Sequence, residues 1–299
     1  MRKNITWPYT LLGSLLAILA LSSFPASADM AKVDEVIRFE LPRAPLTPMQ
    51  QKQLPQGAQN LDPGSFEGRY RHPGGNDKKP ALVVIRTCHD ASYYDAWLDR
   101  LNDWGFATLT FSRCQPPSFE PDDATIPAFD WKRGSLAAIG ALNFLAKKPE
   151  IDAKKIGILS WSRLGMIPLS ILNYEGFAQF FPHKFSAGVA LYPFCSFARG
   201  PHGGPILIIA GAKDSWIDNT VCKRVERVSR QDDFPVSLIM LENATHGFDI
   251  PQFGSPKQVT RSQINPDGFA ASGGILGHDK ASEARAIKEV KAFLNKHLR

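Results

Sequence analysis

Several features that would indicate common functional classes are missing from the 299-residue sequence. It has no dense run of lysine and arginine interleaved with aromatic residues, which argues against a nucleic-acid partner. Neither the four cysteines nor the histidines have a spacing typical of a metal site, so no bound metal is expected. With 43% hydrophobic residues, the sequence also excludes a disordered protein.

Long apolar runs are scarce near the N-terminus. The mostly apolar stretch Leu11–Leu21 is shorter than the roughly 20 residues that a membrane-spanning helix needs. It follows Arg2 and Lys3 and precedes Ala26-Ser27-Ala28, which together are the three regions of a secretory signal peptide. We predict cleavage after Ala28 and a secreted or periplasmic protein with no stable membrane insertion. A membrane anchor is the alternative.

Cleavage at this point would leave 271 residues and lower the formal net charge from +6 to +4, because residues 1–28 carry two basic and no acidic side chains. This length fits one large domain or two small ones. Strand and helix signals continue without an obvious linker after residue 80. We therefore favour a single domain over residues 66–299, preceded by an N-terminal arm over residues 29–65.

Export would also bring the four cysteines into an oxidising compartment, where disulfides persist. Four cysteines allow three pairings. We favour Cys88 with Cys114 and Cys195 with Cys222, since three of the four follow expected strands and the fourth lies in an expected helix. Four free, buried thiols are the alternative.

Short apolar segments alternate with helical patterns from residue 81 onward. Apolar strands separated by helices imply an α/β fold with a mostly parallel sheet covered on both faces. Two further strands, expected near 35–41 and 66–72, would form an edge hairpin. The other expected strands are 81–86, 106–111, 155–161, 186–194, 205–211 and 236–242, and the expected helices are 93–104, 131–148, 164–174, 219–231 and 280–297.

Functional groups in such a sheet collect at the carboxyl ends of the strands. The segment IGILSWSRLG (156–165) predicts a buried strand, a sharp turn and a helix, with Ser162 at the turn. The usual pattern for a nucleophile at such a turn is G-x-S-x-G. Ser160 and Leu164 occupy the two glycine positions here, and a glycine follows one place later as Gly165. Ser160 is a rival nucleophile, and a structural turn serine is the alternative for Ser162.

A serine nucleophile needs a base within hydrogen-bond reach and an acid that orients the base. His246 lies in NATHGFD after one expected strand, and Asp214 lies in GAKDSW after another. Ser162, Asp214 and His246 thus follow three strands, in the chain order used by α/β-hydrolases. A surface histidine and a helix-capping or turn aspartate are the alternatives. Asp218 is expected to cap the helix that begins at residue 219, and Asp249 is expected to be structural.

Over roughly residues 66–298, the chain resembles the dienelactone hydrolase family of α/β-hydrolases. The resemblance is carried by ALVVIRTCHD, IGILSWSRLG, LYPFC, GAKDSW and ATHGFD, of which the last two are the most specific. It implies hydrolysis of a small-molecule carboxylic ester or lactone through an acyl-enzyme, without a metal or organic cofactor. Namesake members use cysteine as the nucleophile, whereas Ser162 stands in that position here and points to an esterase-like relative.

The segment expected to form the oxyanion loop departs from the family, which commonly has a His-Gly pair there. This chain has Arg86-Thr87, followed by Cys88-His89-Asp90. Because an oxyanion hole needs backbone N–H groups, we assign it to the amides of Arg163 and Cys88. His89 and Asp90 either contact substrate or belong to a solvated loop.

Aromatic residues close to the three strand ends, Trp216, Tyr192 and Phe248, are expected to line the substrate pocket. The stretch 253–277 is either a loop over this pocket or a surface excursion. Leu164 and the Arg86-Thr87 pair motivate a different class of function, a binding protein that kept the fold and lost turnover. Peptidase activity ranks last, because the sequence shows no propeller-like domain that would filter peptides.

Overall fold

The computed structural model describes residues 30–43, 64–86, 91–112, 131–173, 176–198, 200–259 and 274–299. The predicted signal peptide lies outside these residues, as do Cys88, His89, Asp90 and Cys114. Within the described part of the chain, no helix is long and apolar enough to cross a membrane.

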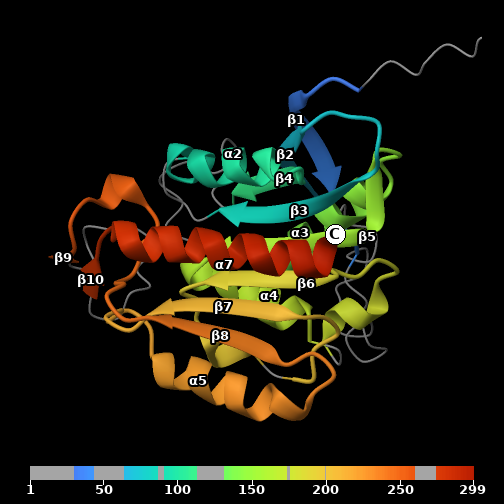
Figure 1. Cartoon of the computed structure of the whole chain (residues 1–299). Coiled ribbons are helices and arrows are strands. Elements are labelled where there is room, and N and C mark those ends of the chain that lie inside the picture. The colour runs from blue at the N-terminus through green and yellow to red at the C-terminus, as the bar shows by residue number, and fades with distance from the viewer. Residues whose placement is uncertain are drawn as a thin grey trace, which may run out of the picture.

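An eight-stranded sheet forms the centre of the molecule, in the order β1-β2-β4-β3-β5-β6-β7-β8 (Figure 1). The six strands from β4 to β8 in this order run parallel, whereas β2 is antiparallel to both of its neighbours. The predicted mostly parallel sheet is therefore confirmed. The strands are β1 (Val33–Glu40), β2 (Ser65–His72), β3 (Lys79–Arg86), β4 (Ala107–Ser112), β5 (Ile151–Trp161), β6 (Ala187–Leu191), β7 (Ile206–Gly211) and β8 (Val236–Leu241).

Helices cover both faces of this sheet. Helices α2 (Asp95–Asp103) and α7 (Lys280–Leu298) pack on one face, and α7 lies in front of the sheet in Figure 1. Helices α3 (Trp131–Ala146), α4 (Met166–Ile171) and α5 (Asn219–Val228) pack on the other face. The short elements are the 3-10 helices η2 (Ala91–Tyr94), η3 (Ser162–Gly165), η4 (Phe177–Phe180), η5 (Cys195–Phe197), η6 (Ser229–Gln231) and η7 (Pro251–Phe253), and a separate two-stranded sheet of β9 (Lys257–Val259) and β10 (Gly274–Leu276).

Burial along the strands follows from this double coverage. All six residues of β7 are buried, and β3 is buried continuously from Ala81 to Ile85. Strands that are covered on both faces cannot alternate between apolar and polar residues. Strand β2 instead alternates between exposed and buried positions, because only one of its faces is covered.

Several predicted elements end earlier in the structure, including the helix expected over 219–231, which ends at Val228 and is followed by η6. The strand expected over 186–194 ends at Leu191, because Tyr192 adopts a positive φ of 40° that no strand can continue through. The helix expected over 164–174 is divided into η3 and α4 and ends at Ile171. Tyr192 directly follows β6, and η3 directly follows β5.

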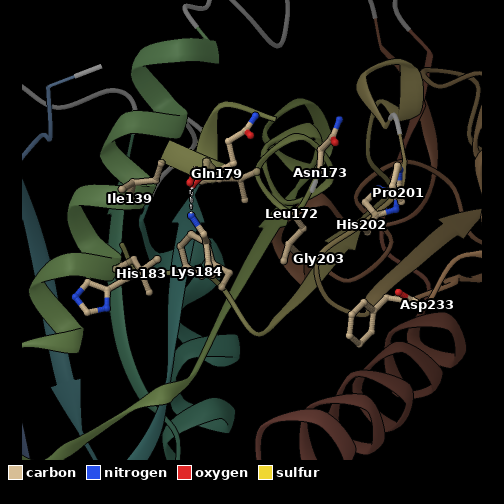
Figure 2. Close-up of a pocket in the computed structure, with 15 residues that line it drawn as sticks. Ile139, Leu172, Asn173, Gln179, His183, Lys184, Pro201, His202, Gly203 and Asp233 are labelled. Carbon is tan, nitrogen blue, oxygen red and sulfur yellow. Dashed lines mark hydrogen bonds between the residues drawn. The ribbon is translucent and has the colours of Figure 1, made fainter. Parts of the chain in front are cut away.

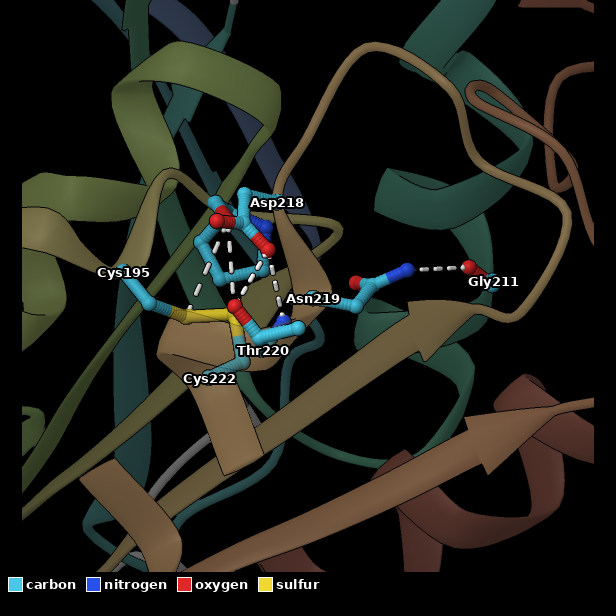
Figure 3. Close-up of a disulfide and its surroundings, with 7 residues drawn as sticks. Cys195, Gly211, Asp218, Asn219, Thr220 and Cys222 are labelled. Atoms are coloured by element: carbon cyan, nitrogen blue, oxygen red, sulfur yellow. Dashed lines mark hydrogen bonds between the residues drawn. A yellow bond between two sulfur atoms is a disulfide. The ribbon is translucent and has the colours of Figure 1, made fainter. Parts of the chain in front are cut away.

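The disulfide predicted between Cys195 and Cys222 is present and joins η5 to α5 (Figure 3). The Cys88–Cys114 pairing falls outside the described residues. Figure 3 also shows the predicted cap of α5, in which the carboxylate of Asp218 accepts a hydrogen bond from the backbone N–H of Thr220 at 2.9 Å. The disulfide thus ties the chain segment after β6 to a capped helix that follows β7.

Candidate active site

Ser162 sits at a strained turn between β5 and a short helical segment. It follows Trp161, the last residue of β5, and has a positive φ of 52°. Positive φ values are uncommon for residues other than glycine. A serine held in this conformation at a strand-to-helix turn presents its hydroxyl away from the strand, where a base can reach it.

The residues around Ser162 explain why the glycine of the motif is displaced. A Cβ atom added at Gly165 would lie 2.7 Å from the Cβ of Pro193, so this position must be glycine. Leu164 is only 4% exposed and packs into the hydrophobic core. The close approach that requires a glycine therefore occurs at residue 165, and a large side chain fits at residue 164.

Ser160 has no access to a substrate. It is fully buried within β5, and its hydroxyl donates a hydrogen bond to the carbonyl oxygen of Ile85 on the neighbouring strand β3 at 2.9 Å. Of the two serines in this segment, Ser162 is the one that contacts a histidine.

The structure brings Ser162, His246 and Asp214 into one line of hydrogen bonds. Ser162 Oγ lies 2.7 Å from His246 Nε2, and His246 Nδ1 lies 2.8 Å from Asp214 Oδ2. A carboxylate can only accept, so Nδ1 carries the proton and Nε2 is free to accept from the serine hydroxyl. Asp214 Oδ1 also accepts a hydrogen bond from the backbone N–H of Trp216 at 2.8 Å, and this second contact fixes the orientation of the carboxylate. This arrangement can activate a hydroxyl nucleophile.

The three side chains come from the carboxyl ends of β5, β7 and β8. Asp214 and His246 lie in the turns after the neighbouring strands β7 and β8. Gly247 follows the histidine with a φ of 70°, and a Cβ added there would lie 2.6 Å from the ring of Phe253. Glycine is therefore required directly after His246 for the chain to turn back at this point.

Two aromatic rings flank the imidazole of His246. The ring centroid of Tyr192 lies 4.7 Å from that of His246 in an edge-on arrangement, and the centroid of Trp216 lies 5.6 Å away. Tyr192 and Phe248 are buried, at 3% and 0% exposed, whereas Trp216 is partly exposed. The substrate-binding role expected for the three aromatic residues stays a prediction.

A buried carboxylate that the sequence marked only as structural lies next to these rings. Asp249 is 1% exposed and accepts hydrogen bonds from Trp97 Nε1, Trp161 Nε1 and the Tyr192 hydroxyl, each at 2.8 Å. Burial raises the pKa of Asp249, and the three hydrogen bonds oppose that rise. Burial also raises the pKa of Tyr192, so its hydroxyl stays protonated and donates.

Only one of the two residues predicted to form an oxyanion hole lies within the described residues. Arg163 directly follows Ser162 and is the second residue of the helical turn η3. The amide of Cys88 lies outside the described residues, together with Thr87 and the rest of that loop. The assignment of the oxyanion hole to Arg163 and Cys88 stays a prediction.

A cavity of about 630 Å³, whose lining residues are drawn in Figure 2, lies at the end of the sheet opposite to the triad. Its lining residues Phe185, Gly203 and Phe234 precede β6, β7 and β8, whereas the triad follows its strands. His202, which is 3% exposed, also lines the cavity. This cavity is therefore separate from Ser162. Among the described residues, no group of three or more His, Cys, Asp or Glu side chains could hold a metal ion.

Comparison with known proteins gives structural relatives only. No family model and no curated protein sequence matches the chain. Among solved structures, a dienelactone hydrolase-like promiscuous phosphotriesterase from metagenomic libraries is 19% identical, with a TM-score of 0.62 over 90% of this chain and 100% of that chain. Esterase 2 of Thermogutta terrifontis, solved phosphoramylated by tabun, is 11% identical, with a TM-score of 0.54 over 79% of this chain and 91% of that one.

A third structural relative is a peptidase. The acylaminoacyl peptidase of Pyrococcus horikoshii is 14% identical, with a TM-score of 0.56 over 89% of this chain but only 42% of its own length. At these identities the likeness concerns the fold. The chain thus has the α/β-hydrolase fold, and dienelactone hydrolase-like proteins are among the solved structures that it resembles.

Proposed function

We propose that this protein is an exported serine hydrolase that cleaves a carboxylic ester or lactone through an acyl-enzyme. The observation that carries the proposal is the unbroken hydrogen-bonded line from Ser162 through His246 to Asp214 at the carboxyl edge of the sheet. Each of the three follows a different strand of an α/β-hydrolase fold, where catalytic groups of this fold class collect. Export rests on the N-terminal sequence pattern.

In the proposed reaction, His246 Nε2 takes the proton of Ser162 as Oγ attacks the carbonyl carbon. Asp214 holds the imidazole in the required tautomer and stabilises the imidazolium that forms. The backbone N–H groups of Arg163 and Cys88 donate hydrogen bonds to the carbonyl oxygen and stabilise the negative charge that develops on it. The imidazolium then protonates the departing alcohol, and a water molecule activated by the same histidine hydrolyses the acyl-enzyme.

The ester or lactone class is favoured by the structural relatives, two of which are named as dienelactone hydrolase-like or as an esterase. This chain covers less than half of the length of the peptidase relative, so peptide cleavage remains the less favoured activity. Leu164 is one of the reasons to consider a non-catalytic binding protein. This reason is weaker in the structure, because the close approach to Pro193 occurs at Gly165 and Leu164 packs into the core.

The test is labelling and turnover with a matched pair of serine variants. Purified protein is expected to hydrolyse short-chain p-nitrophenyl esters and to be labelled by a fluorophosphonate, and Ser162→Ala is expected to lose both properties. Ser160→Ala is the control, because its hydroxyl is buried against Ile85, and it is expected to keep the label. A folded wild-type protein that neither reacts nor turns over would favour the binding-protein alternative. Label retained in Ser162→Ala would place the nucleophile elsewhere.

A further inference from the structure

The buried carboxylate of Asp249 connects the chain segments that carry two members of the triad. Asp249 lies three residues after His246, in the same turn. Its three hydrogen-bond donors come from different parts of the fold: Trp97 from α2, Trp161 from the end of β5 and Tyr192 from the segment after β6. One side chain of the histidine loop therefore holds three separate elements.

Two of these donors are directly linked to the reacting groups. Trp161 precedes Ser162 in the chain, so its indole fixes the residue from which the strained turn begins. Tyr192 packs the edge of its ring against the imidazole of His246, at a centroid distance of 4.7 Å. A movement of the Asp249 carboxylate would be passed to the nucleophile through Trp161 and to the base through Tyr192.

The chemistry of the three partners makes this cluster rigid. All three donate, so the carboxylate acts only as an acceptor, and hydrogen bonds to a charged acceptor are stronger than neutral ones. An unpaired carboxylate in this position would carry a large desolvation cost, which disfavours any arrangement that breaks these contacts. Fully satisfied buried polar networks of this kind specify one arrangement of the groups around them.

We propose that Asp249 is a positioning residue of the triad, whose carboxylate fixes Ser162 and His246 relative to each other through Trp161 and Tyr192. This inference rests on the proposed function, since positioning affects turnover only if the triad is active. The required precision is high, because a displacement of about 1 Å can lower the rate by about 10²-fold.

A matched pair of tyrosine variants separates positioning from plain stability. Tyr192→Phe removes one hydrogen bond to Asp249 and keeps the ring beside His246. Tyr70→Phe is the control, because Tyr70 is a buried tyrosine that also donates to a carboxylate, that of Glu150 at 3.0 Å, which directly precedes the amino end of β5. Tyr192→Phe loses a buried hydroxyl–carboxylate hydrogen bond and Tyr70→Phe a partly buried one, so each variant is expected to lose some stability.

Turnover should differ between the two variants. We expect Tyr192→Phe to lower kcat on a p-nitrophenyl ester about 10-fold with little change in KM, and Tyr70→Phe to leave both constants near the wild-type values. Asp249→Asn, whose amide group would face three donors, is expected to lower kcat further, by about 10²-fold per folded molecule. A Tyr192→Phe variant that loses stability but keeps the wild-type kcat would overturn the proposal and leave Asp249 a structural residue.

A spectroscopic measurement keeps this test apart from the proposed function. The Nδ1 proton of His246, held against Asp214, should give a low-field NMR resonance in the wild type and in Tyr70→Phe. It should be broadened or lost in Tyr192→Phe, because the imidazole would be less firmly held. If the wild type turns over no ester, the proposed function fails, while this resonance still reports whether Asp249 positions the histidine. An unchanged resonance in Tyr192→Phe would contradict the proposal.

Discussion

At the scale of single residues, Asp214 sets both the tautomer and the orientation of His246. We expect Asp214→Asn to lower kcat by about 10³- to 10⁴-fold, because an amide nitrogen facing Nδ1 would favour the wrong tautomer. The fold should persist, since the amide oxygen can still accept the backbone N–H of Trp216. Steady-state kinetics on p-nitrophenyl esters, with circular dichroism as a check on folding, would measure the effect. Near-normal turnover would mean that another acid orients the histidine.

Leu164 offers a second prediction at the same scale. Placing the glycine of the G-x-S-x-G pattern with Leu164→Gly should not raise activity, because residue 164 packs into the core and the close approach to Pro193 occurs at Gly165. The variant should instead lose about 2–5 kcal/mol of stability through the cavity that it creates. Leu164→Met, which conserves volume, should cost less than about 1.5 kcal/mol. Urea denaturation would measure both values, and a gain of turnover in Leu164→Gly would refute this account.

The three residues of the hydrogen-bonded line could be predicted from the sequence, whereas the cluster around Asp249 could not. Ser162, Asp214 and His246 each follow an apolar strand, and strand ends can be located from local patterns. Trp97 lies 152 residues before Asp249, so their contact depends on how α2 packs against the histidine loop. No local pattern encodes a contact of this kind.

At the scale of secondary structure elements, α7 depends on Asp279 as its N-cap. The Asp279 carboxylate accepts a hydrogen bond from the backbone N–H of Ser282 at 2.8 Å. The hydrogen bonds from the side chain and then the backbone of Ser282 lower the pKa of Asp279. A lowered pKa in the folded state adds stability above the unfolded pKa of about 3.9, and this stability is lost as the pH falls through the folded value. The contribution should therefore be complete at neutral pH and fade in acid.

We expect Asp279→Ala to lower the free energy of unfolding by about 1 kcal/mol at pH 7. The difference from the wild type should shrink as the pH falls below about 4, because the wild-type carboxyl becomes protonated there. Lys280→Ala, at the exposed first residue of α7, is the control and should show no such pH dependence. Urea denaturation across this pH range would measure the effect. A difference that stays constant in acid would show that the cap does not act through its charge.

The order of strands and helices could be predicted because the sheet is covered on both faces, which makes its strands continuously apolar. The end of an element was less predictable where the residue that follows the strand is also apolar. Tyr192 reads as part of β6, yet its ring is buried against His246 while its backbone has already turned. A buried residue in a strand and a buried residue just after it both appear as apolar in the sequence, so the end of β6 at Leu191 could not be predicted.

At the scale of the whole molecule, the boundary expected at residue 65 separates two strands that the structure pairs. All eight residues of β1 are in register with β2. Phe39 of β1 packs against Phe66 and Phe111, with ring centroids 6.2 Å and 5.4 Å apart. Helix α3 also approaches β1 closely, because a Cβ added at Gly140 would lie 2.4 Å from the carbonyl oxygen of Glu40. Strand β1 therefore contributes to the same core as the strands that carry the triad.

A chain that begins at Gly64 should consequently be much less stable and prone to aggregation. Removing β1 would expose the aromatic cluster and leave β2 as an open edge, and unprotected edges pair with other chains. Phe39→Ala alone should cost about 3–5 kcal/mol through loss of the buried ring. Val36→Thr is the control, because Val36 lies on the same strand but is 67% exposed, and it should be close to neutral. Size-exclusion chromatography and thermal unfolding would measure these effects; a monomeric truncated chain with wild-type stability would show that the domain begins after β1, as the sequence alone suggested.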